Sequence, residues 1–131
     1  MNRGTKNLCT AWSCITDVPT ERGSLALCLG SQRFDVVKET YANIDVDRDS
    51  LSGSLGHDPR EFSAGRFAGG RWATADFEAG DVLVFGMHLL HASLTNVDPS
   101  RRLRISCDTR WQPSDEEMDR RWVSPIPAAN S

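Results

Sequence analysis

The sequence lacks any apolar run long enough to span a membrane, and residues 1–7 lack the apolar stretch of a secretory signal peptide. It also lacks a strong charge of one sign, since the net charge is -3 and the isoelectric point is near 5.5. A nearly neutral chain has little long-range attraction for nucleic acid or for an anionic membrane surface. We therefore expect neither nucleic acid nor a membrane as a partner, and we expect no signal peptide.

Paired cysteine motifs are also missing. Cys9, Cys14, Cys28 and Cys107 form no Cys-x-x-Cys pair, which is the usual spacing of a zinc or redox site. Cys9, Cys28 and Cys107 lie within apolar or alternating runs, where a cysteine behaves as a small buried hydrophobic residue. We predict buried free thiols, and hence a reducing, cytoplasmic location.

The composition is that of a globular protein. Of the 131 residues, 39% are hydrophobic and 25% are charged, which excludes a disordered tail. The length suits one domain or part of one. Internal repeats and low-complexity segments are absent, so solenoid and fibrous classes are excluded.

Short apolar or alternating runs, separated by turn residues, dominate the pattern. We expect strands over residues 8–15, 24–29, 72–77, 82–85 and 103–111, with extended chain over 87–94. A short helix is compatible with residues 34–42. Many short strands and little helix predict an all-β sandwich or barrel.

Residues 32–70 have the weakest pattern, and 43–70 are rich in Asp, Gly, Ser and Arg. We expect a long surface loop here. Loops of this length are uncommon in compact domains unless they cover a site, so the segment is a candidate lid or substrate wall.

The expected strand 103–111 has one apolar and one polar face. Leu103, Ile105, Cys107 and Thr109 share one face, and Arg104, Ser106, Asp108 and Arg110 share the other. The polar face of such a strand usually contacts water. In a barrel with a ligand in its mouth, it can line the interior instead.

Three blocks of sequence, in a fixed order, carry a resemblance to a known family. The clearest is GDVLVFGMHLLHASLTN at 80–96, followed by RLRISCDTRWQP at 102–113. Upstream lie WSCITD at 12–17, RGSL at 22–25 and Gly30-Ser31. Together these blocks resemble the phytanoyl-CoA dioxygenase family, and the upstream ones are similar to its earlier strands. The resemblance covers most of the chain, with residues 32–70 the least constrained part.

The resemblance implies a double-stranded β-helix, also called a jelly-roll barrel, that binds iron(II), Fe(II), and the co-substrate 2-oxoglutarate. In this family a His-x-Asp pair and a later histidine bind the metal, and an arginine on the following strand binds 2-oxoglutarate. By resemblance, His91 is the later histidine, Arg102 is the arginine by its offset, and Ser93 lies near the co-substrate carboxylate. The implied reaction is hydroxylation of a small organic or acyl substrate, with no residue assigned a catalytic role beyond binding.

The residue chemistry agrees with these assignments and leaves two alternatives open. In extended chain, His91 and Ser93 point to the same side, and a guanidinium suits a carboxylate through two parallel hydrogen bonds. Arg101 and Arg104 compete with Arg102, because Arg104 shares a strand face with it. His88 is the nearest rival of His91, although we favour a non-ligand role for it.

The sequence departs from the family pattern at the other metal ligands. No histidine here has an aspartate two residues on, and Gln32 follows Gly30-Ser31 where the family has a histidine. We therefore expect residues 1–131 to be the C-terminal portion of one jelly-roll domain, a fragment without the His-x-Asp ligands. Its exposed strand edges should favour self-association. The alternative is a non-catalytic β-sandwich, a binding or structural module that lost the metal site.

Overall fold

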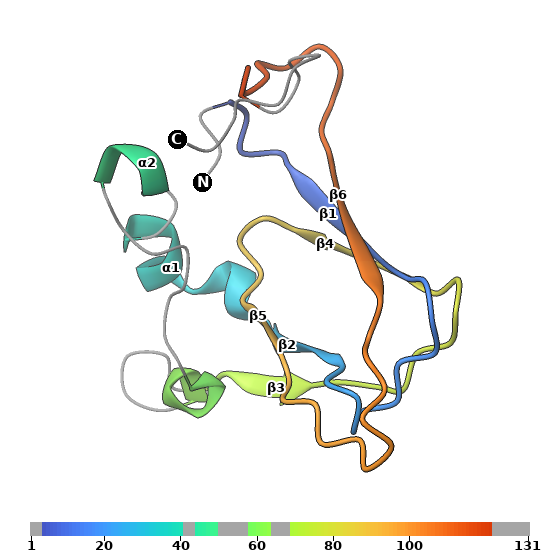
Figure 1. Ribbon diagram of the computed structural model, residues 1–131. Coiled ribbons are helices and arrows are strands. Elements are labelled where there is room, and N and C mark those ends of the chain that lie inside the picture. Colours follow the sequence, from blue (N-terminus) through green and yellow to red (C-terminus); the bar gives the residue numbers. More distant parts are fainter. Residues whose placement is uncertain (1–3, 41–43, 50–57, 64–68, 122–131) are drawn as a thin grey trace.

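The computed structural model describes residues 4–40, 44–49, 58–63 and 69–121, and six of its elements are strands in two small antiparallel sheets (Figure 1). Sheet 1 has the order β4-β1-β6, from β1 (Cys9–Cys14), β4 (Val82–Gly86) and β6 (Ser106–Trp111). Sheet 2 has the order β3-β2-β5, from β2 (Leu25–Leu29), β3 (Arg71–Ala73) and β5 (His91–Ser93). The mainly β prediction is confirmed and the sheets are consistent with an incomplete all-β fold. Closure into a jelly roll stays a prediction.

The central strand of sheet 1 places alternate side chains on opposite faces. Thr10, Trp12 and Cys14 are buried, whereas the residues between them are half-buried. Trp12 lies opposite Leu83 of β4 and opposite Asp108 of β6. Because directly opposed residues in an antiparallel ladder share a face, the register defines which β6 side chains point toward the core.

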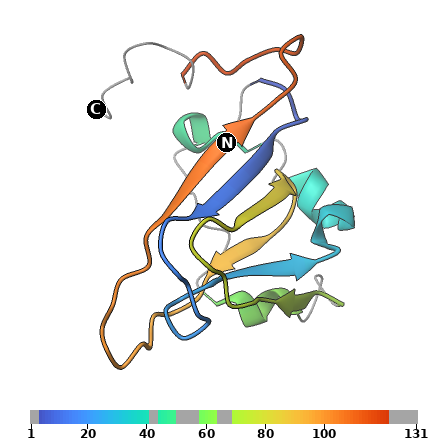
Figure 2. The ribbon, with the colours of Figure 1, turned by 90° about the vertical axis from the view of Figure 1, so that its right-hand side faces the viewer.

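The main hydrophobic core lies between the two sheets. Its buried members are Trp12, Cys14, Val18, Leu25 and Phe85. Trp12 and Phe77 meet edge to face, with their ring centroids 5.0 Å apart. Since Leu25 comes from sheet 2 and Trp12 from sheet 1, this cluster joins the two sheets. Figure 2 shows the strands of the two sheets from a second side.

A second cluster covers the other face of sheet 2. Cys28, Val37, Phe62 and Leu90 are its buried members. They bring together β2, helix α1 (Asp35–Thr40) and the 3-10 helix η2 (Pro59–Ser63). The preceding 3-10 helix η1 (Ser31–Arg33) buries Ser31, whose hydroxyl accepts a hydrogen bond from the Leu90 amide at 2.8 Å. Sheet 2 is therefore packed on both faces.

The range 32–70 differs from the expected long loop. Helix α1 falls within the range 34–42 considered compatible with helix, but α2 (Val46–Asp49) and η2 lie in the part expected to lack regular structure. Phe62 supplies the physical reason for η2, because its burial against the second cluster anchors that turn. The other residues of this range, 41–43, 50–57 and 64–68, lie outside the described part of the chain.

The cysteine predictions are confirmed in part. All four cysteines are free, and Cys14 and Cys28 are buried, which raises the pKa of each thiol. Cys107 is exposed, so its predicted burial is wrong. It lies opposite Ser13 on the face of sheet 1 that points away from the core, and β6 is an edge strand.

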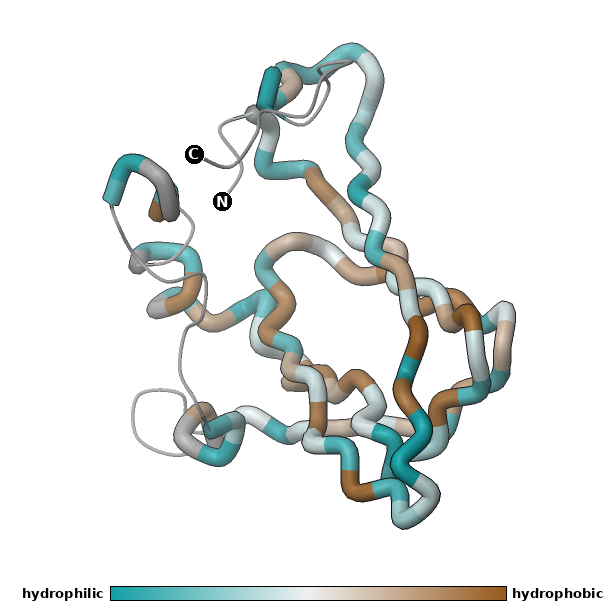
Figure 3. The backbone as a smooth tube through the Cα atoms, viewed as in Figure 1, coloured by the Kyte–Doolittle hydropathy of each residue, from teal (hydrophilic) through white to brown (hydrophobic). Residues whose placement is uncertain are grey.

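That outward face of sheet 1 carries several exposed apolar side chains. Val82 and Val84 of β4 are 56% and 62% exposed, and Trp111 of β6 is 62% exposed. The apolar and hydrophilic residues alternate along the chain that leads into β6 (Figure 3). Among the described residues, no helix has the length and apolarity needed to cross a membrane.

Candidate functional site

Two side chains of β5 point into the space between the sheets. His91 lies opposite Leu27, and Ser93 lies opposite Leu25. Leu25 belongs to the core between the sheets, so His91 and Ser93 also face sheet 1. Both are exposed, which means that the core does not close over them.

The local contacts of His91 select one form of its ring. Nδ1 lies 3.0 Å from the carbonyl oxygen of Leu89, and the ring centroid is 4.8 Å from that of Phe85. A carbonyl oxygen only accepts, so Nδ1 must donate its proton. In the neutral imidazole, Nε2 then carries the free lone pair, which is the arrangement that metal-binding histidines use.

Arg104 reaches Ser93 from the chain leading into β6. Its Nη2 donates to Ser93 Oγ at 3.0 Å, and its Nη1 donates to the carbonyl oxygen of Gly23 at 2.5 Å. The guanidinium carbon also lies 5.9 Å from the centroid of the Trp12 ring, within the range of a cation–π contact. Three contacts therefore hold Arg104 beside Ser93.

Arg102 has different partners. Its Nε donates to Ser100 Oγ at 2.8 Å and lies 3.5 Å from a carboxylate oxygen of Asp98, and its side chain is 67% exposed. The structure thus brings Ser93 together with Arg104, the alternative left open by the sequence, and not with Arg102. Counting residues from His91 could not show this, because the conformation of the turn determines which arginine returns to β5.

The polar face of β6 lies on the same side of sheet 1 as Trp12. Asp108 lies opposite Trp12 and Arg110 lies opposite Thr10, so both point to the core side of sheet 1. Their side chains are about half exposed and pair at 3.6 Å. Of the two alternatives for this strand, the polar face therefore lines the inner side, and the apolar face is outward.

The described residues do not make an iron centre by themselves. Residues 4–40, 44–49, 58–63 and 69–121 contain no group of three His, Cys, Asp or Glu side chains placed to hold a metal ion. Oxygenase iron requires two imidazoles and a carboxylate, and His91 supplies one imidazole. His88, its nearest rival, adds no such group. The donors that do converge, Arg104 and Ser93, suit a carboxylate.

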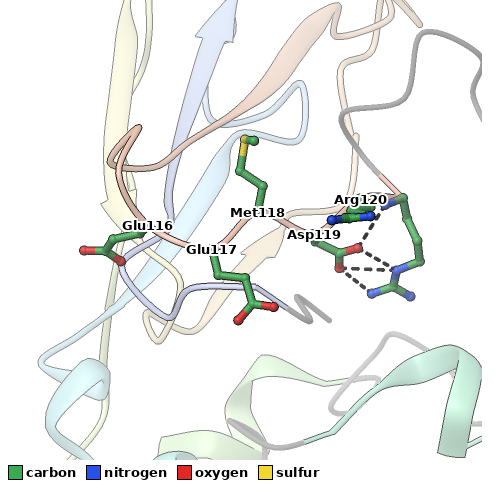
Figure 4. A pocket seen from close by; sticks show the side chains of 6 residues that line it. Glu116, Glu117, Met118, Asp119 and Arg120 are labelled. Atoms are coloured by element: carbon green, nitrogen blue, oxygen red, sulfur yellow. Dashed lines mark hydrogen bonds and ion pairs between the residues drawn. The ribbon is translucent and has the colours of Figure 1, made fainter.

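A separate cavity lies beyond β6 and is lined by residues 116–121 (Figure 4). Two of its three carboxylates have partners. Asp119 pairs with Arg121 at 2.6 Å, and Glu116 accepts hydrogen bonds from the Asn7 amide at 2.8 and 3.0 Å. The sequence analysis predicts no site in this segment.

The comparisons with known proteins bear on this arrangement. The family model described as phytanoyl-CoA dioxygenase (PhyH) matches residues 2–103. The chain belongs to the phytanoyl-CoA dioxygenase family. The match includes His91, Ser93 and Arg102 and ends one residue before Arg104. No curated protein and no solved structure matches the chain.

Membership of the phytanoyl-CoA dioxygenase family indicates the type of chemistry. The family is of the iron(II)- and 2-oxoglutarate-dependent oxygenase type. The resemblance in the glycine-to-asparagine run at 80–96 is therefore confirmed at the level of the family.

Proposed function

We propose that this chain provides the 2-oxoglutarate-binding side of an oxygenase site, with Ser93 and Arg104 as the residues that bind a co-substrate carboxylate. The observation that carries the proposal is the hydrogen bond from Arg104 Nη2 to Ser93 Oγ, 3.0 Å long. It joins β5, which carries His91, to the chain leading into β6. Family membership supports 2-oxoglutarate as the co-substrate in this proposal.

The remaining hydrogen-bonding capacity of these groups suits a carboxylate. Each Nη of a guanidinium has two N–H groups, and Arg104 uses one from each on Gly23 and Ser93. One N–H on each of these nitrogens remains to donate to a carboxylate. Ser93 Oγ accepts from Arg104, so its own proton is available to donate to the same carboxylate. The Trp12 ring lies on one side of the guanidinium, with its centroid 5.9 Å from the guanidinium carbon.

His91 is the metal ligand in this proposal. Its Nε2 lone pair is available because Nδ1 donates to Leu89, and its ring faces the same space as Ser93. One imidazole does not suffice for iron, so the remaining ligands must come from outside the described residues. The proposed substrate is a small organic or acyl molecule, on the grounds of family membership.

The test is binding of 2-oxoglutarate by isothermal titration calorimetry, with a matched pair of arginine variants. Because charge-assisted hydrogen bonds are lost, Arg104→Ala should weaken binding by about tenfold or more. Arg102→Ala is the control, since it removes an equally charged but 67% exposed side chain. It should leave the affinity within about twofold. The reverse result would assign the carboxylate to Arg102 and reject this site.

A second candidate function is a non-catalytic β-module, favoured by the lack of a three-ligand group among the described residues. The two candidates differ in their response to His91→Ala. If His91 binds iron, the substitution should lower Fe(II) affinity and abolish any succinate formed from 2-oxoglutarate. Equal metal binding by both proteins, with no succinate from either, would favour the module.

A further inference from the structure

A buried ion pair lies next to the candidate carboxylate site. Arg22 Nε and Asp98 Oδ2 are 3.0 Å apart, and the two side chains are only 6% and 2% exposed. Arg22 Nη1 also donates to the carbonyl oxygen of Asp17 at 2.6 Å. The other carboxylate oxygen of Asp98 accepts from the amide and the hydroxyl of Ser100, at 2.8 and 2.5 Å. Both carboxylate oxygens of Asp98 and two nitrogens of Arg22 therefore have hydrogen-bond partners.

These contacts keep Asp98 ionised. The Ser100 hydroxyl, followed by Arg22, lowers the pKa of Asp98 to about 2. An isolated buried carboxylate would instead resist ionisation. The charge on Asp98 is therefore a permanent feature of the turn between β5 and β6 at ordinary pH.

The ion pair closes a short ladder that continues the pairing of β2 with β5. Arg22 forms an antiparallel bridge with Asn96, and the Val97 amide donates to the Glu21 carbonyl at 2.7 Å. The Leu94 amide donates to the Ser24 carbonyl at 2.9 Å. Residues 21–24 and 94–97 are thus paired along their length. The Arg22–Asp98 ion pair lies at the end of this pairing.

Gly23 lies inside that ladder and connects the Arg22–Asp98 ion pair to the candidate carboxylate site. It has a positive φ of 79°, and a Cβ there would lie 2.6 Å from the carbonyl oxygen of Leu94. Its own carbonyl accepts the hydrogen bond from Arg104. The carbonyl oxygen that orients Arg104 therefore belongs to the residue directly after Arg22. The backbone at that residue has a conformation and a close contact that only glycine tolerates.

The path of the chain from Asn96 to Arg104 involves the same ion pair. Asn96 Nδ2 donates to the Arg102 carbonyl at 2.8 Å, and Arg102 itself lies 3.5 Å from Asp98. Arg101 has a φ of 55°, so the turn makes a sharp change of direction before Arg104. The side chains of Asn96 and Asp98, at the start of the turn, therefore both contact Arg102 at its end.

We propose that the Arg22–Asp98 ion pair is a positioning device for the carboxylate site. It holds the Gly23 carbonyl and the 96–102 turn in a fixed relation, so that Arg104 is aimed at the ligand beside Ser93. Arg22 and Asp98 do not touch the ligand. The inference rests on the proposed function, because it concerns how that carboxylate is held.

The main test compares two buried aspartates. Asp98→Asn keeps the shape of the side chain and removes its charge. Asp119→Asn does the same at a carboxylate that is 4% exposed and paired with Arg121 away from the site. With both variants folded, Asp98→Asn should weaken 2-oxoglutarate binding by about tenfold, the equivalent of one charge-assisted hydrogen bond. Asp119→Asn should stay within about twofold.

A double variant separates positioning from stability. Replacing a buried ion pair with apolar residues of similar size often restores stability. Arg22→Met combined with Asp98→Leu should therefore recover much of the melting temperature lost in Asp98→Asn, but not the affinity. If affinity returns together with stability, the pair is merely structural and the proposal is overturned.

A second measurement distinguishes failure of this inference from failure of the proposed function. The NMR signal of the Arg104 Nε–H group reports the aim of the side chain without any ligand. It should shift or broaden in Asp98→Asn and stay unchanged in Asp119→Asn. An altered signal in a protein that never binds 2-oxoglutarate would reject the proposed function and retain the positioning role. An unaltered signal with unaltered affinity would reject the positioning role.

Discussion

The two sheets of this protein differ in how they are covered. Sheet 2 is packed on both faces, with Leu25 in the core between the sheets and Cys28 in the cluster with α1 and η2. Sheet 1 buries Trp12 on one face and exposes Val84 and Trp111 on the other. The difference shows that apolar side chains on a strand do not by themselves define the core.

The same contrast explains how the candidate site is built. Sheet 2 presents His91 and Ser93 on a strand that is backed by a second cluster. Sheet 1 contributes Trp12, and the chain leading into β6 contributes Arg104, which reaches across to Ser93. A site between a doubly packed sheet and a singly packed sheet has one firmly held wall and one less supported wall.

The largest expected effect tests the two faces of sheet 1 with two tryptophans. Trp12 is 3% exposed and Trp111 is 62% exposed, although both lie on adjacent strands. Trp12→Ala should lower the free energy of unfolding by about 3–5 kcal/mol, because it removes the centre of the core and leaves a cavity. Trp111→Ala should change it by less than about 0.5 kcal/mol.

Urea denaturation followed by circular dichroism would measure both variants. Equal losses would mean that the outward face of sheet 1 is covered in solution, and the comparison between the sheets would then be wrong.

A smaller effect is expected from two glycines with positive φ. A Cβ at Gly23 would lie 2.6 Å from the backbone oxygen of Leu94, whereas a Cβ at Gly80 would have no neighbour within 4 Å. Gly80→Ala should therefore cost only the conformational strain, about 1–2 kcal/mol. Gly23→Ala should cost more, because a tightly paired backbone must also move. Thermal unfolding would rank them, and a larger loss for Gly80→Ala would contradict the packing of sheet 2.

The smallest expected effect concerns self-association, which we propose occurs through the outward face and edges of sheet 1. Val84 is 62% exposed on that face, and Val97 is 68% exposed in the turn after β5. Val84→Lys should weaken association by about fivefold, or about 1 kcal/mol, because it places a charge on the apolar face.

Val97→Lys adds the same charge outside the sheet and should leave association unchanged. Sedimentation equilibrium would measure both association constants. A monomeric unsubstituted protein, or equal effects of the two lysines, would remove sheet 1 as the surface for self-association.

The strands were the most predictable part of the fold. The expected ranges 8–15, 24–29 and 82–85 coincide with β1, β2 and β4, because alternation and β-branched residues are local signals. The expected strand 103–111 begins only at Ser106. Its first residues are taken up by the turn that returns from Asp98, and the position of that turn depends on Arg22, far away in the sequence.

The sequence predicted which residue types form the candidate site, but it did not predict which arginine contacts Ser93. The shared direction of His91 and Ser93 follows from their spacing in extended chain, and the structure places both toward sheet 1. The choice between Arg102 and Arg104 does not follow from spacing, because the two arginines share the same alternation. The contacts of Ser93 are with Arg104, and the Gly23 carbonyl helps to hold it there.

The amino-acid sequence alone determined the mainly β character, the free cysteines and the family, since each depends on residue types and spacings along the chain. Tertiary structure alone decided which face of sheet 1 is the core side, which arginine meets Ser93, and that a buried Arg22–Asp98 pair supports it. The physical reason is that a local pattern specifies which side chains share a face. Only contacts between distant segments determine what that face meets.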